Sequence, residues 1–299
     1  MQRLFILAVL TLSCLAKAQQ PGSVPGYLLQ LPASISTVLI AETNSSTLHR
    51  FVVTQQGAKL DGGSYISVGQ NGVDKYRAWD RRTPLGIYFI NEQLDTSRLH
   101  EKYGPTAFPL DYPNAWDHRL GRSGDGIWIH GVAADSERRP PLDTDGCIAL
   151  PNDELLAVAG LLTPLVTPVI ITRDLKWIDP QQVFSIRERL HAALDEWTDS
   201  YLSGDLYRYL RLYSNEFQYR GMNENEWSAY RLQTIGAAEI LDFSLDDVLL
   251  LADPEEDGLY LSRFRQTIVD ATHTVVTIKR LYWRESADGN LRIVAEDNG

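Results

Sequence analysis

The sequence predicts two domains, a mainly β unit followed by an α+β unit. The chain has 299 residues, about twice the length of a typical domain of about 150 residues. Up to about residue 175, short runs of β-branched and aromatic residues alternate with turn signals, a pattern typical of strands. From Ser185 onward the apolar spacing becomes helical before strand-like runs return. Hydrophobic residues at 44% and charged residues at 22% exclude a largely disordered or collagen-like chain.

The first 18 residues have the pattern of a secretory signal peptide. Arg3 precedes an apolar run from Leu4 to Leu15, and small residues at Ala16 and Ala18 suit signal peptidase. The apolar run is shorter than the roughly 20 residues that span a bilayer. We therefore expect cleavage after Ala18, a periplasmic or otherwise exported protein of the cell envelope, and no stable membrane insertion of the mature chain.

The chain has two cysteines, Cys14 and Cys147. Acylation of Cys14 in a lipoprotein is an alternative to cleavage after residue 18, but Thr11 stands where such signals usually have Leu. After signal cleavage only Cys147 remains. A single cysteine in an exported chain indicates a reactive thiol or an intermolecular bond, and the alternative is a buried cysteine that acts as a small apolar residue.

The charge balance excludes one class of partner. Lys and Arg number 28 against 39 Asp and Glu, which gives a formal net charge of -11. Nucleic-acid affinity depends on clustered basic side chains, and anionic membranes attract polybasic segments. We expect neither nucleic acid nor a membrane surface as a partner.

The first unit is predicted over residues 37–175, after a lead-in at residues 19–36. Asn152 to Leu162 is predicted as a helix with Asn152 as its N-cap. The predicted strands are Thr37 to Ile40, His49 to Thr54, Ser64 to Val68, Gly86 to Asn91, Gly126 to His130 and Leu165 to Thr172.

The second unit is predicted over residues 185–299, after a linker at 176–184. Ser203-Gly204-Asp205 is expected to end a first helix and cap a second, Leu206 to Phe217. The first helix rests on apolar residues three or four apart, namely Leu190, Leu194, Trp197 and Tyr201. The expected strands are Val248 to Leu251, Leu259 to Val269, His273 to Glu285 and Leu291 to Val294.

Cys147 and His130 form the candidate catalytic pair. A thiol becomes a strong nucleophile when a base or a positive potential favours its thiolate, and His is the usual base. His130 ends a predicted strand, and the loop after it returns the chain to Cys147. Gly146 permits a close approach of backbone that other residues forbid. Amides near Cys147 could then stabilise an oxyanion.

These residues resemble the YkuD family of L,D-transpeptidases, which are peptidoglycan enzymes with a catalytic cysteine. The likeness covers about residues 37–175. The sequence A-F-P-L-D-Y-P-N and the segment G-I-W-I-H-G-V are similar to the branch that contains cell-shape-determining L,D-carboxypeptidases. The segments that carry the resemblance are Thr83 to Gly86, Ala107 to Asn114, Gly126 to Val132, and Thr144 to Cys147.

The resemblance implies a reaction and roles for individual residues. Cys147 would attack the L,D bond of a stem peptide, His130 would take and return the proton, and the Gly131 carbonyl would orient the imidazole. The acyl-enzyme would be resolved by water in a carboxypeptidase or by an amine in a transpeptidase. No cofactor and no metal are implied. The substrate-binding or oxyanion candidates are His118, Thr144, Asp145, Gly146 and Trp128.

The sequence departs from the family pattern at two positions. Many members have His before the Gly-Cys pair and Arg two residues after the cysteine, where this chain has Asp145 and Ala149. The missing Arg puts the usual recognition of a substrate carboxylate in doubt. Asp145 would raise the pKa of the Cys147 thiol unless its side chain points away.

The second unit resembles the nuclear-transport-factor-2-like (NTF2-like) fold, in which a curved sheet and helices form a cone-shaped pocket. Its aromatic residues could line a ligand pocket, but their helical spacing favours a core. These residues are Trp197, Tyr201, Tyr207, Tyr209, Tyr213, Phe217, Trp227 and Tyr230.

Three other functions were weighed. A zinc hydrolase could use His118, His130, Asp145 and Cys147 as ligands, but their spacing matches no compact zinc motif. An amidase-like release of lipoprotein from peptidoglycan would add an envelope lipoprotein as a partner. A non-catalytic envelope protein that binds a ligand would need neither Cys147 nor His130.

Overall fold

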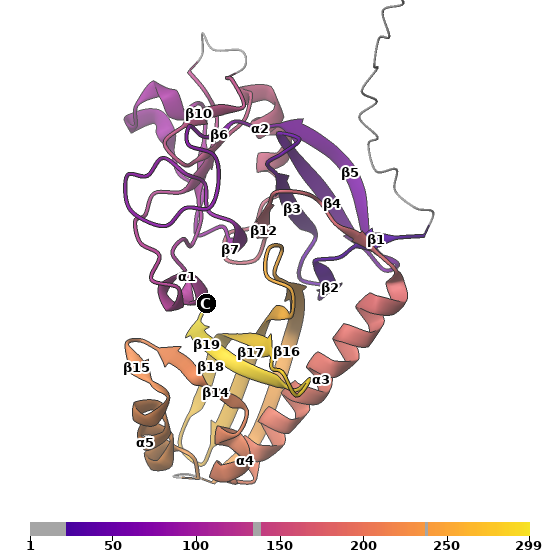
Figure 1. The fold of residues 1–299 in the computed structure, drawn as a ribbon, viewed down its shortest axis with the longest axis vertical. Coiled ribbons are helices and arrows are strands. Elements are labelled where there is room, and N and C mark those ends of the chain that lie inside the picture. The colour runs from indigo at the N-terminus through magenta and orange to yellow at the C-terminus, as the bar shows by residue number, and fades with distance from the viewer. Residues whose placement is uncertain (1–21, 134–138, 237–238) are drawn as a thin grey trace, which may run out of the picture.

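The computed structural model describes residues 22–133, 139–236 and 239–299, which form two adjacent units (Figure 1). The predicted signal peptide, residues 1–18, lies outside the described residues. None of the helices in these ranges has the length and apolar character that a membrane span requires.

The first unit contains a five-stranded sheet in the order β5-β4-β3-β12-β7. β12 runs parallel to β3, with Val169 opposite Leu39, and antiparallel to β7. β3 and β12 are buried along almost their whole length, as their continuous apolar sequences require. The strands are β3 (Thr37–Glu42), β4 (Thr47–Thr54), β5 (Gly57–Tyr65), β7 (Gly86–Phe89) and β12 (Pro168–Thr172).

A smaller three-stranded sheet, in the order β11-β9-β8, carries the candidate site. β9 and β11 are parallel, with His130 opposite Ala149, so Cys147 comes directly before β11. The strands are β8 (Ala107–Pro109), β9 (Trp128–His130) and β11 (Ile148–Ala149), and β6 (Val68–Gly69) pairs with β10 (Leu142–Thr144). The helices of the unit are η1 (Thr96–Arg98), η2 (Glu101–Tyr103), α1 (Ala115–Arg119) and α2 (Asn152–Ala159).

The second unit is a seven-stranded sheet in the order β15-β14-β19-β18-β17-β16-β2, of which β2 (Leu28–Gln30) comes from the lead-in. The long helix α3 runs beside this sheet, and α4 and α5 lie at the end far from the first unit (Figure 1). The strands are β14 (Tyr213–Tyr219), β15 (Met222–Asn223), β16 (Ile240–Ala252), β17 (Leu259–Asp270), β18 (Thr274–Glu285) and β19 (Leu291–Asn298). The helices are α3 (Pro180–Leu202), α4 (Leu206–Leu210) and α5 (Glu224–Thr234).

Most of the aromatic residues of the second unit fill its core. Trp197, Tyr209, Tyr213, Phe217 and Trp227 are buried in one hydrophobic cluster, as the helical spacing predicts. Of the aromatic residues named from the sequence, Tyr201, Tyr207 and Tyr230 are instead partly or largely exposed.

The predicted linker at 176–184 is wrong, because α3 begins within it. The Asp179 side chain accepts a hydrogen bond from the backbone N–H of Gln181, and Pro180 occupies the first helical turn. An acidic N-cap followed by Pro is a strong helix start. Before it, Trp177–Ile178 forms strand β13, which pairs with β1 (Val24–Pro25).

The predicted lead-in at 19–36 also takes part in the fold. Its segment Leu28–Gln30 forms β2, which adds to the edge of the second unit's sheet beside β16. The described part of the lead-in therefore ties the two units together before the first domain begins.

Two further helix predictions are wrong. The helix predicted for Leu206 to Phe217 stops at Leu210, and strand β14 follows because it pairs with β19. Asn152 is not the N-cap of α2; Pro151 holds that position without a side-chain hydrogen bond. The Asn152 amide instead bonds both backbone groups of Val132, at 2.9 and 3.0 Å.

The strand predicted for Ser64 to Val68 is divided in two. β5 ends at Tyr65, Ser67 forms an isolated bridge with Ala149, and β6 begins at Val68. The chain thereby leaves the large sheet and reaches the small sheet that carries the candidate site.

The two units share a hydrophobic core. One buried cluster joins Phe89 and Ile170 of the first unit to Leu251 and Leu261 of the second. Trp116 on α1 stacks on Tyr282 of β18 with ring centroids 6.4 Å apart.

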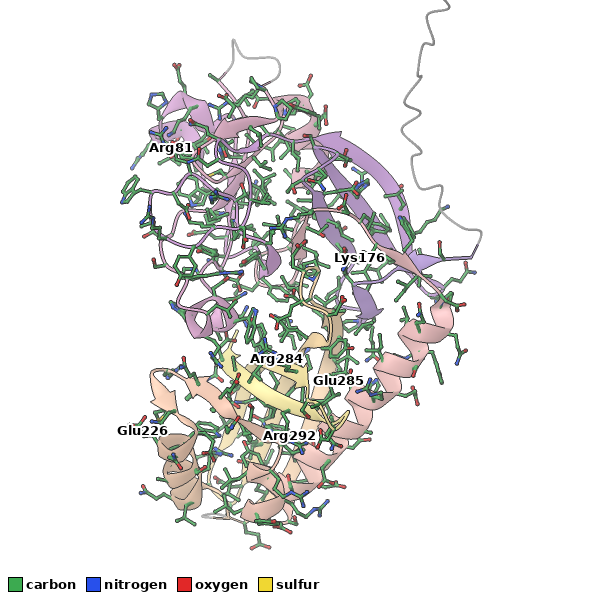
Figure 2. All side chains as sticks on the ribbon, in the orientation of Figure 1. Arg81, Lys176, Glu226, Arg284, Glu285 and Arg292 are labelled. Atoms are coloured by element: carbon green, nitrogen blue, oxygen red, sulfur yellow. The ribbon has the colours of Figure 1, made fainter. Side chains whose placement is uncertain are left out.

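Charged side chains extend this junction. Arg284, which Figure 2 places at the face of the second unit nearest to the first, lies 4.9 Å from the Trp116 ring centroid. Arg81, labelled in the same view, lies in the first unit away from this junction.

A buried ion cluster spans the same junction. Arg280 on β18 pairs with Asp111 of the first unit and with Asp297 of β19, where Nη2 lies 2.8 Å from Oδ2. Burial raises the pKa of Asp111, and the Arg280 guanidinium opposes that rise. Removal of Arg280 would leave Asp111 and Asp297, both largely buried, without the ion-pair partner that the described residues give them.

We predict that Arg280→Met lowers the free energy of unfolding by about 3–5 kcal/mol, because breaking one side of a buried ion cluster leaves uncompensated charge. Urea unfolding followed by circular dichroism measures the change. Arg265 pairs with Asp247 at a more exposed position. Arg265→Met should therefore lower the free energy of unfolding by no more than about 1 kcal/mol. Equal losses in the two variants would contradict this role for Arg280.

Candidate active site

The loop between β10 and β11 presents Cys147. The Thr144 hydroxyl accepts a hydrogen bond from the backbone N–H of Gly146 at 3.1 Å and donates to the carbonyl of Cys147 at 2.7 Å. The Cys147 side chain is half-buried, and its Sγ donates to the Gly126 carbonyl at 3.3 Å. A thiol that donates in this way is in its protonated form.

Thr83 anchors the same loop from the first sheet. Its buried hydroxyl donates to the Gly146 carbonyl and accepts from the Gly69 N–H, both at 2.9 Å. Gly146 has a φ of +128°, and a Cβ there would lie 2.7 Å from the Arg82 carbonyl oxygen, so only glycine fits. In the sequence Thr83 is recognisable only as part of a motif, because its contact with Gly146 depends on tertiary packing.

His130 ends β9 and is buried at 3% exposure. Its Nδ1 lies 2.6 Å from the carbonyl oxygen of Gly131. A carbonyl oxygen only accepts hydrogen bonds, so Nδ1 carries the proton in this contact and Nε2 has a free lone pair. The imidazole is thereby held as a base.

Gly131 lies where no side chain fits. A Cβ at this position would lie 2.2 Å from Asn152 Oδ1 and 2.9 Å from Pro105 Cδ. The Gly131 N–H donates to the Tyr103 carbonyl at 3.0 Å. Close packing and this hydrogen bond therefore hold the Gly131 backbone in place beside His130.

Tyr103 covers the imidazole and was not identified from the sequence. Its ring packs edge-on against His130, with centroids 5.1 Å apart, and lies 4.8 Å from the half-buried Trp128 ring. Tyr103 belongs to the short helix η2 in a polar stretch, where no periodic signal marks it.

Burial keeps both members of the pair neutral. It lowers the pKa of His130 to about 4, although the hydrogen bond to Gly131 favours the protonated ring. It raises the pKa of the Cys147 thiol to about 11, against the opposing effects of the Trp128 backbone and the Lys102 ammonium. At neutral pH the free site therefore holds an imidazole and a thiol.

Two of the other candidate residues point elsewhere. Asp145 is exposed and lies near Arg81, with Oδ1 3.7 Å from Nε, so its effect on the thiol pKa is smaller than that of burial. His118 is exposed on α1. Within residues 22–133, 139–236 and 239–299, no interaction joins His118 to Cys147 or His130.

The described ranges contain no group of three or more His, Cys, Asp or Glu side chains placed to hold a metal ion. The four residues weighed as zinc ligands therefore do not form one site.

Comparison with known proteins identifies both units. Residues 39–171 match the L,D-transpeptidase catalytic domain, YkuD, and residues 189–297 match the Cds6 C-terminal NTF2-like domain. These matches confirm the two-domain fold class and the resemblance seen in the sequence. No curated protein matches the chain.

Solved structures with the same two-unit fold cover nearly the whole chain. The structure of Bd1075 from Bdellovibrio bacteriovorus has a TM-score of 0.76 at 22% identity, covering 93% of this chain and 98% of its own. The crystal structure of the helical cell shape determining protein Pgp2 from Campylobacter jejuni has a TM-score of 0.75 at 25% identity. The match covers 88% of this chain and 91% of the Pgp2 chain.

The neutral pair gives a testable pH dependence. Because the thiol pKa is raised to about 11, alkylation of Cys147 by iodoacetamide should accelerate about 100-fold between pH 7 and pH 9. The alkylation is quenched at set times, and mass spectrometry of the Cys147 peptide gives its rate. A rate that levels off below pH 7 would indicate a thiolate–imidazolium pair and contradict this assignment.

Proposed function

Since residues 39–171 match the L,D-transpeptidase catalytic domain, we propose that this protein is an exported cysteine enzyme of peptidoglycan that cleaves the L,D bond of stem peptides. Water is proposed as the usual acceptor, which makes it an L,D-carboxypeptidase. The observation that carries the proposal is His130, held by Gly131 as a neutral base on the strand beside Cys147.

The first half of the reaction forms a thioester. Cys147 Sγ attacks the carbonyl carbon of the third-position diamino acid, and the thiol proton moves to His130 Nε2. The carbonyl π electrons move onto the oxygen to give an oxyanion. When the carbonyl reforms, the C–N bond breaks, and the amine of the terminal D-amino acid leaves with the proton from His130.

The amide of Cys147 is the proposed donor to the oxyanion. The Gly146 N–H is already used by Thr144 Oγ1, whereas the Cys147 N–H has no hydrogen-bond partner among the described residues. A free amide next to the nucleophile is the usual oxyanion donor. Gly146 and Thr144 then shape the loop rather than bind the oxyanion.

The second half of the reaction regenerates the thiol. His130 Nε2 takes a proton from water as the water oxygen attacks the thioester, and the C–S bond breaks as Cys147 recovers that proton. An amine in place of water would give a transpeptidase. Water is favoured by the resemblance of the Ala107 to Asn114 segment to the carboxypeptidase branch. The likeness to the helical cell shape determining protein Pgp2 over both units supports a role in cell shape.

A neutral His130 can take the proton from the Cys147 thiol, as the proposed first step requires. His130, with a pKa lowered to about 4, is unprotonated and able to accept a proton at any pH well above 4. Protonation of His130 on acidification would remove the base, so activity should fall as the pH drops toward 4.

We predict that Cys147→Ala and His130→Ala each lower tripeptide formation from tetrapeptide muropeptides at least roughly a thousandfold. Mass spectrometry of the products, with and without an amine acceptor, measures the activity of the mature protein. His273→Gln, which changes an exposed histidine of the second unit, should retain full activity.

The products distinguish the alternatives. Cysteine-dependent crosslinks or exchange of the terminal D-amino acid would replace the carboxypeptidase assignment with a transpeptidase. If a folded protein gives neither product, muropeptides linked to lipoprotein are tested next. Failure there as well would overturn the enzymatic proposal in favour of a ligand-binding protein.

A further inference from the structure

Lys102 is a cation beside the candidate catalytic pair. Its side chain is half-buried, and Nζ lies 5.0 Å from the centroid of the Tyr103 ring. Tyr103 in turn packs against His130. Across residues 22–133, 139–236 and 239–299, no carboxylate forms an ion pair with Lys102.

The backbone holds the turn that carries Lys102 against the end of β9. His100 Nδ1 accepts the Lys102 N–H at 3.2 Å. Gly104 follows the turn and packs so closely that a Cβ on it would lie 2.7 Å from the Gly131 Cα. Lys102 therefore keeps a fixed place relative to His130.

The neighbouring cations are already paired. Arg139 Nε lies 3.1 Å from Asp143 Oδ2, and Arg81 pairs with Asp145. Ala149 stands where many family members have Arg, and it is buried opposite His130. Arg82, next to the Gly146 loop, also lacks a carboxylate partner among the described residues, but its Nη1 donates to the Val73 carbonyl at 2.8 Å. Lys102 differs from Arg139 and Arg81 in having no ion pair within the described ranges.

The field of Lys102 reaches both members of the pair. Burial dominates the pKa of each. Arg139 and then Lys102 lower the pKa of His130, and Lys102, followed by Arg139, lowers that of Cys147. Any anion bound near Cys147 lies within the same field.

We propose that Lys102 binds a substrate carboxylate next to the scissile bond and so supplies the charge that the Arg two residues after the cysteine supplies in many family members. This inference rests on the proposed function. A tetrapeptide stem offers two such carboxylates, the terminal one of the D-amino acid and the side-chain one of a diamino acid. Lys102 would then raise the affinity for substrate and leave the chemistry to Cys147 and His130.

The first test uses Cys147 as its own probe and does not require peptidase activity. Iodoacetate carries a carboxylate and iodoacetamide does not, so the ratio of their alkylation rates reports the local positive charge. Lys102→Gln should lower that ratio roughly three- to tenfold, and Lys102→Arg should leave it near the wild-type value. Circular dichroism verifies that each variant is folded.

Lys59→Gln is the matched control, because Lys59 is an exposed lysine on β5. The ratio should not change in this variant. A ratio in folded Lys102→Gln equal to the wild-type ratio would overturn the proposal, as would an equal fall in Lys59→Gln.

The second test measures hydrolysis of three tetrapeptides: one unmodified, one with a terminal carboxamide and one with an amidated diamino acid. In the wild type, amidation of the recognised carboxylate should raise KM about tenfold or more with little change in kcat. In Lys102→Gln the amidated and free substrates should have similar KM.

If neither amidation changes the wild-type KM, the proposal fails. If wild-type protein hydrolyses no substrate, the proposed function fails, and the alkylation ratio still decides the role of Lys102.

Discussion

The 2.6 Å hydrogen bond between His130 Nδ1 and the Gly131 carbonyl is the interaction on which the chemistry of this site depends. It fixes the ring orientation and leaves Nε2 free, which is the task that a carboxylate performs in a serine triad. A neutral carbonyl stabilises an imidazolium less than a carboxylate does. Together with burial, this accounts for a base that stays neutral and a thiol that stays protonated until substrate arrives.

The surrounding fold is arranged to preserve that bond. Asn152, which does not cap its own helix, holds the backbone of Val132 next to Gly131. Gly104 allows the Tyr103 turn to close over His130, and Thr83 ties the nucleophile loop to the first sheet. Farther away, β2 and the Arg280 cluster join the two units through a common core. The strands that carry the candidate pair pack in the core of the first unit, where Phe108, Ile129 and Ile148 are buried.

The sequence predicted those parts of the molecule whose signals are local. The alternation of strands and turns and the choice of His130 and Cys147 as candidates follow from motifs or periodicity. The errors arose where a distant contact decides the outcome. Residues after Leu210 form strand β14 because β19 lies beside them, and Asn152 bonds to Val132 because the fold brings them together.

The same distinction explains the site residues that were missed. The Thr83 motif was visible, but its hydrogen bond to Gly146 depends on tertiary packing. Tyr103 and Lys102 lie in a three-residue helix without any motif. Asp145 and His118 were named from their neighbours in sequence, yet their side chains are exposed to solvent.

The central claim is a covalent acyl-enzyme on Cys147, and rapid-quench mass spectrometry of the intact protein tests it most directly. After brief mixing with a tetrapeptide muropeptide, the account predicts an adduct equal to the substrate minus its terminal D-amino acid, located on the Cys147 peptide. The adduct should be absent in Cys147→Ala and should disappear as tripeptide forms. Tripeptide production without an adduct, and undiminished in Cys147→Ala, would contradict the account.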